Sequence, residues 1–184
     1  GDRKNQLISL RFNQPEVRQI AQLMSGIPYT GAEATESRFK EEVHKYSVIH
    51  LAMHGFIHNE EPLSSGLAFS RQNDTLNDGF LYAHELYNMK MPINLAVLSA
   101  CNTGAGYLAF GEGIMSLSRA FKYAGCPNIV ASYWQANDKS TQDLMTRFFQ
   151  SVKQGSITSD ALREAKLSFL AQANEIQAHP TNWA

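Results

Sequence analysis

Two residues that could form a catalytic pair, His54 and Cys101, each follow an apolar stretch of this sequence. Residues 47–53, SVIHLAM, precede His54 and Gly55, and residues 93–100, INLAVLSA, precede Cys101. A thiol becomes a nucleophilic thiolate near neutral pH when a base or a positive neighbour assists it, and an imidazole can serve as either. If the fold brings them together, the two side chains have the chemistry for acyl transfer.

Both stretches have the pattern of buried β-strands. Residues 47–53 are apolar on both faces, which is typical of a central parallel strand, and we expect further strands at 93–100 and 128–134. In open α/β sheets, the ligand site lies outside the carboxyl ends of the strands. We therefore expect His54 and Cys101 to project at the same edge of one sheet.

Helical patterns separate these strands. Apolar residues recur every three or four positions at 17–24, 35–46, 114–124, 139–154 and from about 159 onward, and a short helix is expected near 85–89. Residues 55–81 are expected to form a long loop that contains a hairpin, GLAFS and DGFLY, around Asn73 and Asp74. Alternating strands and helices predict an α/β fold with a mostly parallel sheet covered on both sides, in one domain over residues 1–184.

The composition argues against several classes of function. The net charge is −1 and no run of Lys or Arg occurs, so a nucleic acid or an anionic membrane surface is not an expected ligand. No apolar stretch is long enough for a membrane span, and the polar start GDRKNQ lacks the apolar region of a signal peptide, so we expect a soluble intracellular protein. Two cysteines without CxxC spacing predict reduced thiols.

Several blocks of the sequence together resemble the CHAT domain of the caspase-like (clan CD) cysteine peptidases, which are related to the separase catalytic domain. They run in the family's order through most of the chain: YSVIHLAMHGF, SSGLAFS, LSACNTG, GEGIMSLSRAFKYAG, NIVASYWQANDKST, LMTRFF, ALREAKLSFL and HPTNWA. The separation of His54 and Cys101 is close to the roughly 50 residues of the caspase signature, although SACNTG differs from its QAC motif. The resemblance implies a three-layer, caspase-like α/β/α sandwich.

The resemblance also implies a cysteine endopeptidase that cleaves a protein partner without a cofactor or a metal. His54 would be the general base or acid, Cys101 the nucleophile, and the backbone N–H groups of Gly55 and Cys101 the oxyanion hole. Asp138 and Ser99 would belong to the S1 pocket, where the Asp138 carboxylate would receive a basic P1 side chain. Because Asp138 also precedes a predicted helix, it is equally expected as an N-cap.

The resemblance further implies a setting for this activity. CHAT domains commonly follow tetratricopeptide-like helical repeats, but this sequence shows no such 34-residue repeat. In the family, the conserved blocks continue past the one that matches HPTNWA into another strand. We therefore expect a catalytic part excised from a larger protein, short of its last strand, with an upstream helical-repeat region or sensor complex as partner. The expected role is cytoplasmic, in regulated bacterial signalling or defence.

Two alternatives to this interpretation stay open at the level of sequence. A caspase-like fold kept as a non-catalytic scaffold or interaction module would carry the same His54 and Cys101. A metal-dependent hydrolase is also conceivable, because His50 and His54 form an HxxxH pattern, but Leu51 stands where the HExxH motif needs Glu. We interpret His50 as a packed, hydrogen-bonded strand residue.

Other residues with chemical potential have weaker functional interpretations. The glycines at 104, 106, 111 and 113 fit neither GxGxxG nor GxxxxGK[ST], which favours a loop beside the nucleophile over a phosphate cradle. Glu112 begins a predicted helix and has only a weak functional case. Cys126 precedes a strand at the opposite edge of the sheet, so we expect it to be inert.

Overall fold

The computed structural model describes residues 13–58, 60–71, 77–99, 112–132 and 138–183. A parallel sheet lies at the centre of this part, with β1 (Val48–Leu51), β5 (Leu95–Leu98) and β6 (Asn128–Ala131) in the order β1-β5-β6. Leu51 lies opposite Leu98, and Leu98 lies opposite Ala131, so the carboxyl ends of the strands meet at one edge. All three strands lie within the stretches that the sequence predicts.

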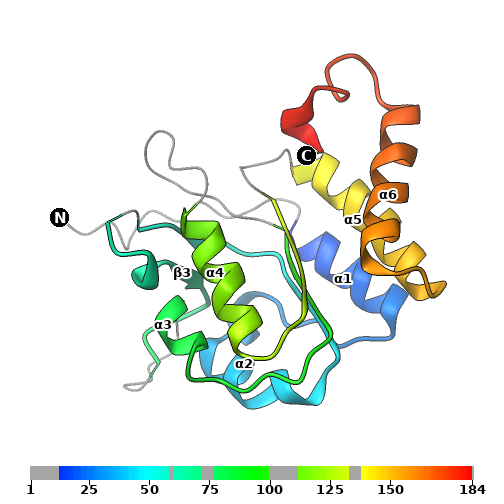
Figure 1. The fold of residues 1–184 in the computed structure, drawn as a ribbon. Helices are drawn as coiled ribbons and strands as arrows, with labels where there is room; N and C mark the ends of the chain where they lie inside the picture. The colour runs from blue at the N-terminus through cyan, green and yellow to red at the C-terminus, as the bar shows by residue number, and fades with distance from the viewer. Residues whose placement is uncertain (1–12, 59, 72–76, 100–111, 133–137, 184) are drawn as a thin grey trace.

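Helices cover both faces of this sheet (Figure 1). On one face lie α1 (Asn13–Met24) and α5 (Asp138–Lys153), with α6 (Thr158–Gln172) packed against α5. On the other face lie α4 (Glu112–Tyr123) and the short helix α3 (Ala83–Leu86). The predicted α/β fold, with helices on both sides of a parallel sheet, is confirmed.

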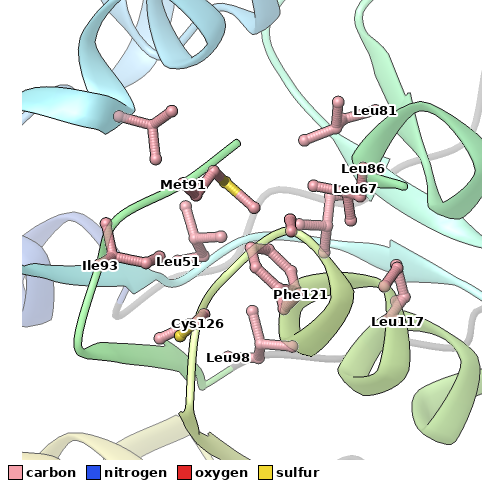
Figure 2. Packing of buried hydrophobic residues seen from close by; sticks show 14 of the residues in the cluster. Leu51, Leu67, Leu81, Leu86, Met91, Ile93, Leu98, Leu117, Phe121 and Cys126 are labelled. Atoms are coloured by element: carbon pink, nitrogen blue, oxygen red, sulfur yellow. The ribbon is translucent and has the colours of Figure 1, made fainter. Parts of the chain in front are cut away.

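The sheet divides the hydrophobic core into two clusters, because successive strand residues point to opposite faces. Val97 packs on the side of α1 and α5, in a cluster that includes the fully buried Phe149. Leu98 packs on the side of α4, in a cluster that includes Phe121 and is drawn in Figure 2. All four residues of β5 are buried, which makes β5 the central strand that its apolar sequence predicts.

The strand β1 differs from its prediction in two ways. It ends at Leu51, earlier than the predicted stretch 47–53. Among the described residues only β5 pairs with it, and Val48, Ile49 and His50 are partly rather than fully buried. The apolar pattern of this strand predicts a central position, whereas within the described part of the chain it lies at the edge of the sheet.

A small antiparallel sheet follows β1 along the chain. It consists of β2 (Gly55–Phe56), β3 (Gly66–Ala68) and β4 (Phe80–Tyr82), in that order. The predicted hairpin is therefore confirmed, with β3 and β4 as its two strands, whereas its turn at residues 73–74 lies outside the described residues. The short strand β2 extends this sheet and was not predicted.

The helix ends follow from local chemistry. The Thr35 hydroxyl accepts a hydrogen bond from the backbone N–H of Arg38, which caps α2 (Glu36–Glu42). Gly125 has φ +111°, a conformation that glycine adopts without strain, and it lies two residues after the end of α4. Short 3-10 turns complete the described elements: η2 (Gly31–Glu33), η3 (Val43–Lys45), η4 (Pro62–Ser64) and η5 (Pro180–Asn182). Within the described ranges, no helix has both the length and the apolar character that crossing a bilayer requires.

Candidate active site

His54 lies beyond the carboxyl end of β1, directly before β2. Because β1 ends at Leu51, the strand does not run straight into His54 as the sequence predicts. The backbone N–H of Ala68 donates a hydrogen bond to the carbonyl oxygen of His54 across 2.8 Å, and Gly55 pairs with Leu67 immediately afterwards. The antiparallel sheet therefore holds the backbone of His54, and its side chain is partly buried at the edge of the parallel sheet.

The segment that leads to Cys101 leaves the parallel sheet beside the segment that leads to His54. The backbone N–H of Ser99 donates to the carbonyl oxygen of Leu51 across 3.2 Å, which continues the β1–β5 ladder past the end of β5. Cys101 itself lies outside the described residues, two positions after Ser99. The structure thus brings together the two strand ends that precede His54 and Cys101, and the contact between the two side chains stays a prediction.

The other predicted site residues lie at or after the same edge. Gly55 is buried in β2, directly after His54. Asp138 is the first residue of α5, in agreement with a helix start at this position, but its side chain lies outside the described part. The predicted roles of Gly55 in an oxyanion hole and of Asp138 in an S1 pocket stay predictions.

A cavity of about 700 Å³ opens beside His54. It follows β1 between α1 and α2, and its wall includes Met24, Phe39 and Met53 as well as His54. Cavities of this size that are lined largely by apolar side chains, with a few polar groups, are typical of binding sites. His54 therefore borders a space of the size that ligand sites have.

His50 is a packed, hydrogen-bonded strand residue, as predicted, and its ring belongs to a buried polar cluster. His50 Nε2 makes a hydrogen bond of 2.9 Å with Ser99 Oγ and lies 2.9 Å from Oε1 of Glu16. The side chains of His50 and Glu16 are 8% and 5% exposed. Phe149 of α5 packs against the imidazole with ring centroids 5.4 Å apart and a 60° angle between the planes. Glu16, His50 and Ser99 are called the polar cluster below.

Glu16 was not predicted from the sequence as a residue of this edge. It lies on α1 four positions before Ile20, and it therefore aligns with the buried face of the helix. A carboxylate in line with an apolar stripe is a signal that could have identified it, because Glu is rarely buried without a partner. The partner, His50, lies on a different element, so no local pattern could have supplied the pair.

Cys126 lies in the hydrophobic core (Figure 2). It precedes the amino end of β6, and that end is opposite to the edge where His54 lies. Its Sγ donates a hydrogen bond to the carbonyl oxygen of Asn128 across 3.1 Å. Burial raises the pKa of the Cys126 thiol, and a raised pKa leaves less of the reactive thiolate at neutral pH. The position agrees with the prediction, and we expect this thiol to be unreactive in the folded protein.

Comparison with known proteins gives relatives that are much longer than this chain. Human tetratricopeptide repeat protein 28 is 23% identical over 202 residues, which covers 93% of this chain and 8% of the human protein. Tetratricopeptide repeat protein 28 of the mouse shows the same identity over the same shares. The chain therefore spans 8% of the length of these curated relatives.

The comparison with protein families covers nearly the whole chain. The sequence model of the CHAT domain matches residues 3–184, which include His54, Cys101 and every element described above. The parallel sheet β1-β5-β6 with helices on both faces is consistent with the caspase-like α/β fold of that family. The chain belongs to the CHAT domain family, which is related to the caspase-like cysteine peptidases.

Proposed function

We propose that this CHAT domain is a cysteine endopeptidase that uses His54 and Cys101 as a catalytic dyad. The observation that carries the proposal is the parallel pairing of β1 with β5, extended by the hydrogen bond from Ser99 to Leu51. This pairing places the strand ends before His54 and Cys101 side by side, where ligand sites of α/β sheets lie. The cavity beside His54 adds room for a ligand.

The proposed reaction is acyl transfer from a peptide bond to the Cys101 thiolate and then to water. Sγ attacks the scissile carbonyl carbon, and backbone N–H groups of Gly55 and Cys101 stabilise the oxyanion that forms. The C–N bond breaks as His54 donates a proton to the leaving amine. His54 then takes a proton from water, which attacks the thioester, releases the carboxylic acid and restores the Cys101 thiol.

We further propose that the S1 pocket selects a basic P1 side chain. Asp138 is the first residue of α5, which follows β6 along the chain, and this chain position is what supports the proposal. A carboxylate opposite Arg or Lys forms a charge-assisted hydrogen bond, which discriminates against neutral side chains. Because the hydroxyl of Ser99 contacts His50, any contact of Ser99 with the P1 side chain is assigned to its backbone.

The proposed regulation follows from the relatives. Both relatives are named tetratricopeptide repeat proteins, and the chain spans a small share of each. We propose that a tetratricopeptide-like region of the same protein, or a sensor complex, controls cleavage of a protein substrate in a cytoplasmic signalling or defence pathway.

A panel of peptide acyloxymethyl ketones that differ only at P1 (Arg, Lys, Leu, Asp) tests this function. The reagents are incubated with the natural full-length protein that carries this chain, and the adduct is located by mass spectrometry. We expect an adduct on Cys101, fastest with Arg or Lys, which is lost in Cys101→Ala and in His54→Gln. Cys126→Ala, which removes the other cysteine, and His58→Ala, which removes an exposed histidine nearby, are the matched controls.

Each outcome of this panel decides one part of the proposal. Labelling of Cys101 that does not need His54, or no labelling in a folded protein with its partners, contradicts the dyad and favours a non-catalytic scaffold. Equal labelling with basic and aliphatic P1 groups, unchanged by Asp138→Asn, contradicts only the S1 assignment.

A further inference from the structure

The polar cluster joins three elements at the edge of the sheet where the dyad is proposed. Glu16 comes from α1, His50 from β1, and Ser99 directly follows β5. His50 precedes His54 by four positions, and Ser99 precedes Cys101 by two. The His50–Ser99 hydrogen bond therefore links the two strands a few residues before each member of the proposed dyad.

The surroundings of His50 favour one tautomer of its imidazole ring. The Glu16 carboxylate of α1 lies 2.9 Å from Nε2, Ser99 Oγ bonds to the same nitrogen, and Phe149 of α5 packs on the ring. The buried Nδ1 of His50 has no hydrogen-bond partner in the described part of the chain. A proton on Nδ1 would bury an unsatisfied donor, which is costly, so the proton belongs on Nε2. The Nε2–H group then donates to Ser99 Oγ while the carboxylate of Glu16 attracts it.

The energetics of the cluster favour a role in geometry over a role in bulk stability. Moving a carboxylate and an imidazole out of water is unfavourable, and well-packed apolar side chains of similar volume are often at least as stabilising as a buried charged pair. The hydrogen bond between His50 and Ser99 differs from apolar packing because it fixes direction and register. In this cluster, the contacts of His50 hold Ser99 in a fixed position relative to β1 and α1.

We propose that Glu16, His50 and Ser99 are positioning residues. They hold the start of the Cys101 segment, residues 99–101, against β1, so that the thiol of Cys101 meets the imidazole of His54. The catalytic part of this inference rests on the proposed function. In this arrangement each residue acts through another: Glu16 orients His50, and His50 holds Ser99. Misplacement of a catalytic group by about 1 Å reduces a rate about 100-fold, so the anchor affects turnover more than substrate binding.

Four variants test the cluster in the natural full-length protein. Ser99→Ala removes only the hydroxyl, His50→Leu removes the ring nitrogens, and His50→Gln keeps an N–H donor near the position of Nε2. Ser116→Ala is the matched control, because Ser116 is similarly buried (5% exposed, against 6% for Ser99) and its hydroxyl donates to the carbonyl oxygen of Pro62 on the α4 side of the sheet. kcat and KM are measured separately on a peptide substrate with the preferred P1 residue, together with Tm.

The expected result is a change in kcat that stability does not explain. We expect Ser99→Ala to lower kcat about 10- to 100-fold with KM within about twofold. Its Tm and that of Ser116→Ala should both fall by about 2–4 °C, while Ser116→Ala keeps its kcat. The kcat of His50→Gln should be higher than that of His50→Leu. If His50→Leu fails to fold, Ser99→Ala is the deciding variant.

A second measurement separates this inference from the proposed function. Hydrogen exchange at the backbone amide of residue 99, which donates to Leu51, reports the anchor without any need for activity. If the wild-type protein lacks peptidase activity, the proposed function is overturned. Faster exchange at residue 99 in Ser99→Ala than in Ser116→Ala would then still support the anchor. In an active protein, unchanged kcat or unchanged exchange in Ser99→Ala, or a rise in KM alone, overturns the positioning role.

Discussion

The backbone N–H of Ala68 donates a hydrogen bond to the carbonyl oxygen of His54 across 2.8 Å. Ala68 is the last residue of β3, so the antiparallel sheet holds the residue that we propose as the catalytic base. The other side of the proposed site is held by the parallel sheet, through the hydrogen bond from Ser99 to Leu51. The position of His54 relative to the Cys101 segment therefore depends on both sheets, and a change in either should affect activity.

Gly66→Ala is expected to disturb the antiparallel sheet and, through it, His54. A Cβ atom at Gly66 would lie 2.6 Å from the carbonyl oxygen of Leu81 and 2.6 Å from Cζ of Phe56. Because the Leu81 oxygen belongs to the backbone of β4, the two strands must move apart. We expect a loss of about 2–3 kcal/mol in the free energy of unfolding, measured by urea denaturation, together with reduced labelling of Cys101.

Gly26→Ala is the control for this substitution. The nearest atom to a Cβ at Gly26 is Cα of Ala21 at 3.8 Å, an ordinary van der Waals contact. We expect its free energy of unfolding to change by less than about 0.5 kcal/mol and its Cys101 labelling to stay at the wild-type rate. A Gly66→Ala protein as stable as Gly26→Ala would contradict the close approach of β3 and β4.

The two cysteines are expected to react with iodoacetamide at very different rates. Cys126 is fully buried, and burial raises the pKa of its thiol, so little thiolate is available at neutral pH. Cys101 is the proposed nucleophile and should carry a thiolate assisted by His54. In a time course at pH 7 followed by peptide mapping, we expect Cys101 to be modified at least about tenfold faster than Cys126.

Unfolding provides the control for this comparison. In concentrated urea both thiols are exposed, and the two rates should converge. Equal rates in the folded protein would contradict either the burial of Cys126 or the activation of Cys101. Repeating the time course with His54→Gln distinguishes these explanations, because only the rate at Cys101 should respond.

Local apolar patterns predicted the elements of this fold better than their positions in the sheet. The stretch LAVL at 95–98 is apolar throughout and is the fully buried central strand β5. The stretch at 48–51 has a similar pattern, but within the described residues its strand β1 lies at the edge of the sheet. A pattern records how apolar a segment is, whereas its place in the sheet depends on which distant segments pair with it.

The candidate site was predictable where it depends on strand ends and was missed where it depends on contacts between distant residues. The pairing of β1 with β5 could be expected from the two apolar stretches that precede His54 and Cys101. The contact of Glu16 with His50 joins α1 to β1, and neither helical nor strand periodicity identifies such a pair. Residues missed for this reason are polar, buried and distant in sequence from their partners.

Lys40 is a second example of such a contact, and it supports a prediction of its own. From α2 its Nζ donates to Glu36, which is buried, and across 2.8 Å to Oε1 of Glu85 on α3. The other oxygen of Glu36 accepts the backbone N–H of Gly79 across 2.9 Å. These contacts join α2 to α3 and to the segment that leads into β4.

Lys40→Met is expected to destabilise the folded protein. It keeps most of the apolar stem of the side chain but leaves the Glu36 carboxylate, 2% exposed, without its cationic partner. Removal of one partner of a fully buried ion pair typically costs about 3–5 kcal/mol, but the Lys40 side chain is 30% exposed and solvent screens the interaction. We therefore expect a loss of about 1–2 kcal/mol in the free energy of unfolding, measured by urea denaturation at pH 7.

The pH dependence of this loss provides a second measurement. Burial lowers the pKa of Lys40, but the hydrogen bonds to Glu36 and Glu85 outweigh it, so the pKa in the folded protein lies above its ordinary value of 10.5. The stabilisation is therefore fully present below pH 10.5 and is lost as the pH rises through the raised pKa. We expect the stability difference between wild type and Lys40→Met to be constant from pH 7 to 9 and to shrink above pH 10.5.

Lys45→Met is the control, because it removes an exposed ion pair with Glu42. Its stability should not differ measurably from that of the wild type at any of these pH values. A loss of stability as large as that of Lys40→Met would refute the special role of the buried Glu36.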